Sequence, residues 1–239
     1  MQRDGEHELL NTKTDSTLSA CVYPYWHPSG EYIAYSVNNT RQSFHTVREE
    51  RIEVFDLASD VVIYHPATHR LLRSPLLQRS ESFETFPVFS ADGSKLYFCS
   101  SKAQEIPSGY QDIHYDLCSI DFDPATGEFG QQVDTLLKVS TQGKSISFPR
   151  PSYDGRYLVY TLSNYGNFSI WHKEADLWLL DLEQGTTRPL SEVNSDDTES
   201  FHNWSADSRW MVFSSRRNGG LYTRLYFTHL DGQGHFSKP

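Results

Sequence analysis

The chain has 239 residues and carries 21 Lys and Arg against 31 Asp and Glu, which gives a formal net charge of −10 at pH 7. This charge argues against nucleic acid as a partner, because binding phosphates requires a basic groove and the sequence shows none. No segment approaches the roughly 20 apolar residues of a membrane span, and residues 1–20 lack the apolar stretch of a secretion signal. The sequence therefore predicts neither a membrane span nor a signal peptide.

Four segments share one pattern, in which a bulky residue and a small polar residue lead into a tight turn. The turns end at Gly30, Gly93, Gly155 and Ser208, so they lie 63, 62 and 53 residues apart. Asp-Gly pairs such as the one at Gly93 supply the positive φ that two-residue hairpins need. Self-similarity on this scale, built from strands, is typical of propellers and solenoids.

Each turn joins two strands of a predicted four-stranded unit, here called a, b, c and d in chain order. Strand b follows the turn, strand c ends near an acidic residue in the first three repeats, and strand d comes after a second turn. The expected b strands are 32–36, 95–99, 157–161 and 210–214, the c strands 52–57, 117–122, 177–182 and 225–230, and the d strands 70–72, 136–139 and 187–190. Asp56, Asp121 and Asp181 end the first three c strands, where His229 stands in the fourth. We expect these aspartates to accept hydrogen bonds from nearby backbone amides.

Apolar and aromatic residues occupy consecutive positions of strand b, so both faces of each unit are expected to be buried. This predicts an all-β fold, a β-propeller of four-stranded antiparallel blades with four repeats in this chain. The repeat follows the pattern of an aromatic, a Pro, an aromatic, Ser-x-Asp-Gly, a strand, a loop and then Asp-Leu-aromatic-x-x-Asp-Leu. This pattern resembles the WD-like repeat of TolB-type β-propellers over about residues 20–231. The copy from Ser152 to Leu182 matches this pattern best. The resemblance implies the periplasm or outer envelope of a bacterium.

The repeats divide the chain into five predicted parts. Blade 1 takes residues 20–82, blade 2 takes 83–144, blade 3 takes 145–199, and an incomplete blade 4 takes 200–239, while 1–19 holds an outer strand at 9–12. That strand either closes a four-bladed ring on blade 4 or belongs to a preceding blade of a larger propeller with six to eight blades. We favour the larger propeller, because the fourth repeat stops where its d strand should begin.

The sequence contains few motifs that would indicate a metal site or a catalytic site. Cys21, Cys99 and Cys118 have no CxxC or Cys/His ligand spacing, and we expect buried thiols, with a Cys99–Cys118 disulfide as the alternative. No Gly-x-Ser-x-Gly nucleophile elbow occurs. The sequence predicts no structural metal, no cofactor and no enzyme activity of its own. The alternative is an accessory propeller module of a peptidase or redox enzyme whose catalytic part lies outside this chain.

The loops between strands b and c are the best candidates for function, since propeller geometry puts them all on one rim and loops on a rigid scaffold usually carry function. They are rich in aromatic, Arg, Asn and His side chains, the residue types of interface hot spots. We expect them to bind a protein, a peptide or an envelope glycan, or else merely to cap the blades. Loops of different blades should stay about 10 Å or more apart, too far for their histidines to share a metal. The predicted binding residues are Phe44, His45, Tyr110, His114, Tyr165, Asn167, Trp171, His172, Arg216 and Arg217.

Overall fold

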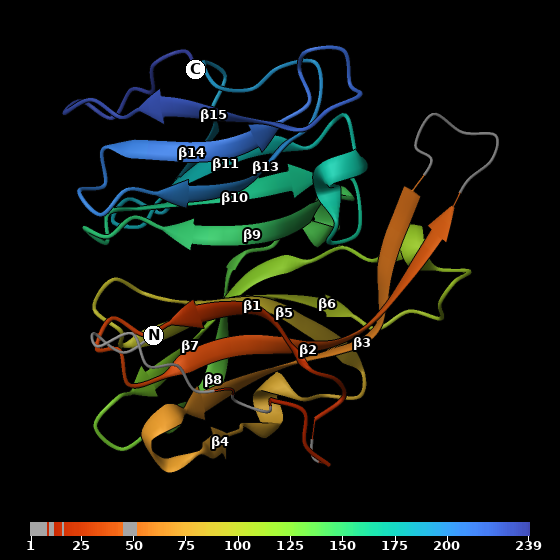
Figure 1. The fold of residues 1–239 in the computed structure, drawn as a ribbon, viewed down its shortest axis with the longest axis vertical. Helices are drawn as coiled ribbons and strands as arrows, with labels where there is room; N and C mark the ends of the chain where they lie inside the picture. Colours follow the sequence, from red (N-terminus) through yellow and green to blue (C-terminus); the bar gives the residue numbers. More distant parts are fainter. Residues whose placement is uncertain (1–8, 10–11, 16, 45–51) are drawn as a thin grey trace.

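The computed structural model describes residues 9, 12–15, 17–44 and 52–239. Within these residues, fifteen strands form four separate antiparallel sheets, three with four strands and one with three, in a four-blade propeller arrangement (Figure 1). The predicted all-β propeller is therefore confirmed. Within the described residues, the structure has no helix that is both long and apolar enough to cross a membrane.

The strands follow one another in order across each sheet, as expected for a, b, c and d. Blade 1 contains β1 (Cys21–Trp26), β2 (Ile33–Phe44), β3 (Ile52–His65) and β4 (Arg70–Leu72). Blade 2 contains β5 (Ser82–Phe89), β6 (Lys95–Lys102), β7 (Asp116–Asp123) and β8 (Glu128–Leu137). Blade 3 contains β9 (Ser145–Pro151), β10 (Tyr157–Ser163), β11 (Asp176–Asp181) and β12 (Thr186–Pro189). Blade 4 contains β13 (Glu199–Trp204), β14 (Trp210–Ser215) and β15 (Arg224–His229). Single 3-10 turns lie at Pro66–Thr68, Pro75–Leu77, Tyr110–Asp112, Ser140–Gln142 and Ser169–Trp171.

The a–b turns have the conformation that the sequence predicts. Gly30, Gly93 and Gly155 have φ near +75°, and Ser208, which replaces glycine in the fourth copy, has a φ of 59°. In blade 2 the Ser90 hydroxyl donates to Asp92, and the backbone NH of Ser94 donates to the same carboxylate. Each turn is thus closed by its own side chains as well as by backbone hydrogen bonds.

Successive blades pack face to face, which explains the consecutive apolar residues of the b strands. On β6, Leu96 and Phe98 lie in a buried cluster with blade 1, whereas Tyr97 and Cys99 lie in a cluster with blade 3. A third cluster joins blades 3 and 4. Because strand b is buried on both faces, it does not show the alternation of a half-exposed strand.

The inner strands carry one aromatic each in the left-handed region. Tyr23, Phe86, Phe148 and Phe201 have φ between 48° and 53°, at the point where each a–b register shifts by a β-bulge. The rings of these side chains pack against one another at tilted angles, with centroid distances of 4.5 Å for Tyr23–Phe86 and 4.3 Å for both Phe86–Phe148 and Phe148–Phe201. The aromatic-Pro part of the repeat thereby gains a structural meaning that the sequence did not reveal.

The c strand of the first repeat extends further along the chain than the expected residues 52–57. The structure extends β3 to His65, and the part of β3 that continues the blade is its second half, where Ile63 pairs with Ala34 and with Leu72. Tyr64 lies opposite Ile33, so His65 ends this strand as Asp181 ends β11. Asp56 lies inside the hairpin, and its carboxylate accepts side-chain hydrogen bonds in place of the expected backbone ones. Asp181 does accept from the backbone NH groups of Glu183 and Gln184.

The three cysteines are free thiols. Cys99 pairs with Leu117 while Cys118 pairs with Phe98, so the two side chains point to opposite faces of blade 2. A disulfide between them, the alternative from the sequence, is therefore wrong. Burial raises the pKa of the Cys118 thiol to about 11.

The described residues of the N-terminal segment lie outside any strand. Leu9 is exposed, and the Thr12 hydroxyl accepts a hydrogen bond from the backbone NH of Cys21 at 3.1 Å, which places Thr12 beside blade 1. Leu10 and Asn11 lie outside the described residues. The assignment of 1–19 to an outer strand and the five predicted boundaries stay predictions.

Candidate functional site

A long hairpin of blade 1 organises the surface formed by the b–c loops. Strands β2 and β3 pair from Ile33 and Tyr64 out to Phe44 and Ile52, with a register shift after Asn39, so they run well past the other strands of their sheet. Figure 1 shows this hairpin projecting toward the b–c loops of blade 3. Its strand β3 carries two buried acids, Glu53 and Asp56.

Aromatic rings join this hairpin to the b–c loops of blades 2 and 3. Phe55 on β3 packs against Tyr110 with ring centroids 5.8 Å apart, and Tyr110 packs edge-on against Tyr165 at 5.7 Å. Tyr165 then packs against His172 at 4.5 Å. The rings form a continuous row that crosses three blades.

Glu53 is the polar centre of that row. The Tyr165 hydroxyl donates to Glu53 Oε2 at 2.9 Å, and His172 Nε2 lies 3.6 Å from Glu53 Oε1. Burial raises the pKa of Tyr165, and the neighbouring Glu53 carboxylate raises it further, so the phenol remains a hydrogen-bond donor. His172 is buried, and its Nδ1 lies 3.9 Å from Glu174 Oε1.

A second polar contact between blades 1 and 3 lies beside the first. Asp56 accepts hydrogen bonds from Asn38 Nδ2 at 2.8 Å, from Thr40 Oγ1 at 2.6 Å and from Asn167 Nδ2. Burial raises the pKa of the Asp56 carboxyl, although these three donors pull it down. Because Asn167 belongs to the b–c loop of blade 3, the hydrogen bond links residues 111 positions apart.

Blade 4 extends the surface through a cation–π contact. The Arg216 guanidinium carbon lies 4.5 Å from the centre of the Trp171 ring, and both side chains are half-buried. We call the surface made by Glu53, Tyr110, Tyr165, Trp171 and Arg216 the b–c rim.

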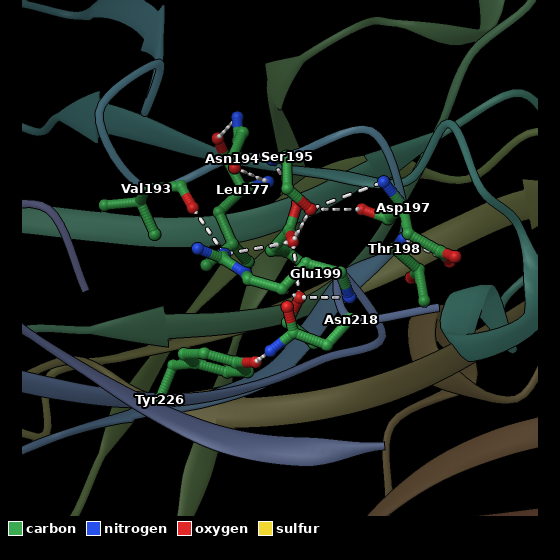
Figure 2. A network of polar contacts seen from close by, with 11 residues as sticks. Leu177, Val193, Asn194, Ser195, Asp197, Thr198, Glu199, Asn218 and Tyr226 are labelled. Carbon is green, nitrogen blue, oxygen red and sulfur yellow. Dashed lines mark hydrogen bonds and ion pairs between the residues drawn. The ribbon is translucent and has the colours of Figure 1, made fainter. Parts of the chain in front are cut away.

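Arg217 belongs to a different network, although it follows Arg216 directly. Its guanidinium donates to the buried Glu199 at 3.1 Å and to the Val193 carbonyl, and it lies 4.5 Å from the Tyr226 ring centre. Figure 2 shows Glu199 enclosed by hydrogen bonds, with Ser195 donating to it at 2.6 Å and Asn218 bonded to the Tyr226 hydroxyl. The Glu199 carboxylate is therefore paired with Arg217 inside this network and is not part of the b–c rim.

The remaining predicted residues lie apart from the rim or outside the described structure. His114 is half-buried and lines a separate cavity of about 490 Å³ on blade 2, together with Arg79 and Asp116. Phe44 ends β2, and nothing is described of its side chain. His45 lies outside the described residues. The structure thus joins Tyr110, Tyr165, Asn167, Trp171, His172 and Arg216 and separates His114 and Arg217 from them.

The expectation that b–c loops stay about 10 Å apart is wrong for blades 1, 2 and 3. The loops meet because the β2–β3 hairpin is long enough to reach over its neighbours, a length that is not shared by the other b–c connections. Glu53 and Asp56 were missed as site residues. The available signal was the two acids within the otherwise apolar segment 52–57, which in a propeller indicates a polar contact on a buried face.

The arrangement supplies fixed donors, acceptors and aromatic edges, which is the chemistry of recognition. Within residues 9, 12–15, 17–44 and 52–239, no group of three or more His, Cys, Asp or Glu side chains is placed to hold a metal ion. The half-buried Tyr110 and Tyr165 partly fulfil the capping alternative, because they pack on one another and on the blade ends.

Solved structures with the same architecture include proteins of several activities. A protein assigned to TolB from Agrobacterium tumefaciens superposes with a TM-score of 0.51 at 16% identity, over 93% of this chain and 62% of its own. This chain has the TolB-type β-propeller fold. An oligogalacturonate lyase in complex with manganese gives 0.55 at 15% identity over 88% and 50% of the two chains. Prolyl oligopeptidase B from Galerina marginata gives 0.55 at 12% identity over 89% and 26%.

These likenesses establish the TolB-type fold and leave activity open. No family model and no curated protein sequence matches the chain. The chain spans 62% of the length of the TolB protein and half or less of the lyase and the oligopeptidase. The same propeller therefore occurs in enzymes as well as in a TolB protein, and the assignment of function has to rest on the site.

Proposed function

We propose that this chain is a non-enzymatic binding module of the bacterial cell envelope that recognises a protein or peptide through the b–c rim. The proposed location, the periplasm or outer envelope, follows from the TolB-type fold and the repeat pattern. The structure offers no observation in favour of an envelope glycan, the other partner class that the sequence left open.

The observation that carries this proposal is the joining of loops from all four blades into one surface. Blade 1 supplies Glu53, blade 2 Tyr110, blade 3 Tyr165 and Trp171, and blade 4 Arg216. Tyr, Trp and Arg dominate binding energy at interfaces because they bring large contact areas together with directed hydrogen bonds. Contacts between the loops fix these side chains in advance, which lowers the entropy lost on binding.

The rival function is an accessory module of an enzyme, as the shared fold of the lyase and the oligopeptidase suggests. In that case the propeller would contribute contacts to a substrate while the reacting groups lie elsewhere. The two functions differ in whether the rim binds a partner protein stably. A binding module holds a partner protein stably, whereas an accessory module alone has no stable partner.

Trp171→Ala tests the proposal. Trp171 is half-buried and packs on Arg216, so its loss removes a large contact area. We expect the variant to lose at least about tenfold in partner affinity, which corresponds to more than about 1 kcal/mol. The immobilised protein would be incubated with a bacterial envelope extract, and the bound proteins quantified by mass spectrometry.

The matched control is Trp210→Ala. Trp210 is an exposed tryptophan of blade 4 at the opposite end of the b strand, packed edge-on against His229. This control should retain every partner and a wild-type melting temperature. If Trp171→Ala also retained every partner, the rim aromatics would only cap the blades and the proposal would be refuted.

A further inference from the structure

A second cavity opens at the opposite end of the strands, where the a–b turns lie. Its volume is about 430 Å³, within the usual range of about 300–1,000 Å³ for ligand pockets. Segments of three blades line it: Pro24 to Pro28, Phe89 to Ala91, and Pro151 to Tyr153. Since the a–b turns and the b–c loops lie at opposite ends of strand b, this cavity is separate from the b–c rim.

Two departures from the repeat place exposed aromatic rings at this cavity. Trp26 is 54% exposed, whereas its counterparts Phe89 and Trp204 are 1% and 5% exposed. Tyr153, also 54% exposed, occupies a turn position that is Pro or Ala in the other three copies. Neither ring is needed to build a blade, because the other copies form the same turn with a buried or a small residue.

Three polar side chains at the cavity can donate hydrogen bonds, one indole NH and two hydroxyls. Within the described part of the chain, no protein atom accepts a hydrogen bond from the Trp26 indole NH or from the hydroxyls of Tyr25 and Tyr153. Two other polar side chains of the lining have partners within the protein, since the Ser152 hydroxyl is bonded to Asp154 and the His27 ring contacts Ser29 and the Gly93 carbonyl. A ligand that offers several hydrogen-bond acceptors fits the three side-chain donors of Trp26, Tyr25 and Tyr153.

A cation without a carboxylate partner packs against Tyr25, one of the residues that line the cavity. The Arg150 guanidinium carbon lies 5.6 Å from the centre of the Tyr25 ring, and one of its nitrogens donates to the Pro149 carbonyl. Among the residues that the structure describes, no Asp or Glu oxygen lies within 4.0 Å of it. A half-buried guanidinium gains substantially from an anionic partner, because solvent does not fully satisfy its charge.

We propose that this cavity binds a proline-rich peptide segment in the polyproline II conformation, with an acidic side chain beside the prolines for Arg150. Such a segment offers backbone carbonyls as acceptors while its prolines lack NH donors, which complements Trp26, Tyr25 and Tyr153. Grooves between exposed aromatic rings accommodate proline rings at low entropic cost, since the segment is already extended. This site goes beyond the proposed function and does not depend on the b–c rim.

The test uses an acetylated, amidated peptide of six prolines followed by one aspartate, titrated into the whole chain by calorimetry. We expect saturable binding that Trp26→Ala and Tyr153→Ala each weaken at least about tenfold. Tyr153 sits in an exposed turn, so Tyr153→Ala keeps the test valid if Trp26→Ala lowers the melting temperature. Trp210→Ala, an exposed tryptophan outside the cavity, should bind like wild type.

The charge pairing is tested by a two-by-two comparison. Arg150→Gln should weaken binding of the aspartate peptide several-fold and leave binding of the matched asparagine peptide unchanged. Equal effects on both peptides would remove Arg150 from the proposal. Absence of binding at millimolar peptide, equal binding of a peptide with alanine for proline, or preferential binding of a disaccharide such as cellobiose would overturn the site itself.

Discussion

At the scale of single residues, the a–b turns are coupled to the turns of neighbouring blades. The His27 ring of blade 1 reaches the Gly93 carbonyl of blade 2 with its Nε2 at 3.1 Å and is itself buried. A Cβ at Gly93 would lie 2.1 Å from that Nε2, whereas nothing lies within 4 Å of a Cβ at Gly30. Gly93 therefore serves both the turn and the contact between blades.

The pair Gly93→Ala and Gly30→Ala separates these two roles. Both glycines have a φ of +76°, so each variant incurs the same backbone strain of about 1 kcal/mol. Gly93→Ala should lose a further 1–3 kcal/mol, approximately, because His27 must move from its buried position. Urea unfolding of both variants measures the difference, and equal losses would show that the His27 contact contributes nothing.

Asp60 predicts a pH dependence of stability. Burial on β3, with the Glu84 carboxylate nearby, raises the pKa of Asp60 to about 6. A raised pKa means that the fold favours the protonated form, so this contribution to stability is present below the unfolded value of about 4 and is lost as the pH rises through 6. Asp60→Asn should therefore raise the melting temperature at pH 7.5 and change it little at pH 4.

Asp207 provides a control of opposite sign. Its pKa is lowered by the hydrogen bond from the Ser205 hydroxyl and by the backbone NH of Arg209. Asp207→Asn should thus lower the melting temperature at pH 7.5 and have less effect at low pH, where the carboxylate is protonated. If both variants shifted stability in the same direction at pH 7.5, this assignment of the two carboxyls would be wrong.

At the scale of elements, the β2–β3 hairpin reaches over the b–c loops of blades 2 and 3. We call its contacts with these loops, made by Glu53, Phe55 and Asp56, the clasp. Asp56 is the residue on which three donors from both sides of the clasp converge. Replacing it leaves Asn38 and Asn167 as buried side chains with unsatisfied donors. We therefore expect Asp56 to contribute most of the free energy by which the clasp stabilises the fold.

Asp56→Ala should cost about 2–4 kcal/mol, since several buried donors lose their acceptor at once. Asp121→Ala is the matched control on a c strand, where an exposed aspartate pairs with an exposed Lys95. That pair lies in solvent, and its loss should cost less than about 1 kcal/mol. Chemical denaturation measures both values, and a loss below 1 kcal/mol for Asp56→Ala would contradict the clasp.

The sequence predicted the blades well because every repeat uses the same local turn chemistry. Strands β6, β10 and β14 begin at Lys95, Tyr157 and Trp210, as the spacing from each turn indicates. The long β3 strand was not predicted, because a hairpin that leaves its sheet depends on contacts with other blades. The same reason hid Glu53, whose partners Tyr165 and His172 are more than 100 residues away in the chain.

At the scale of the whole molecule, the four packed aromatic rings of the inner strands, one from each blade, hold the blades together. We call these four rings the ring cluster. Phe86 is fully buried against Tyr23 and Phe148, which also contact each other, whereas Phe201 contacts Phe148 and is 41% exposed. All four rings come from bulges of identical geometry, which makes them comparable sites. We therefore expect the contribution of each ring to stability to depend on how deeply it is buried in the ring cluster.

Phe86→Ala should destabilise the protein by about 3–5 kcal/mol, the usual cost of a cavity left by a buried phenylalanine. Phe201→Ala should cost about 1 kcal/mol, because one side of that ring already faces solvent. Thermal unfolding followed by circular dichroism compares the two. A similar loss of stability in both variants would mean that the ring cluster does not hold the blades together.

The central claim, that the b–c rim is the binding face, is tested most directly by site-specific photo-crosslinking. A benzophenone side chain would replace exposed residues at the rim, Asp112 or Asn164, or the exposed Glu183 at the opposite end of the strands. After irradiation in envelope extract, the account predicts adducts of the same mass from positions 112 and 164 and none from 183. Adducts from position 183 alone, or adducts distributed equally over the three positions, would contradict it.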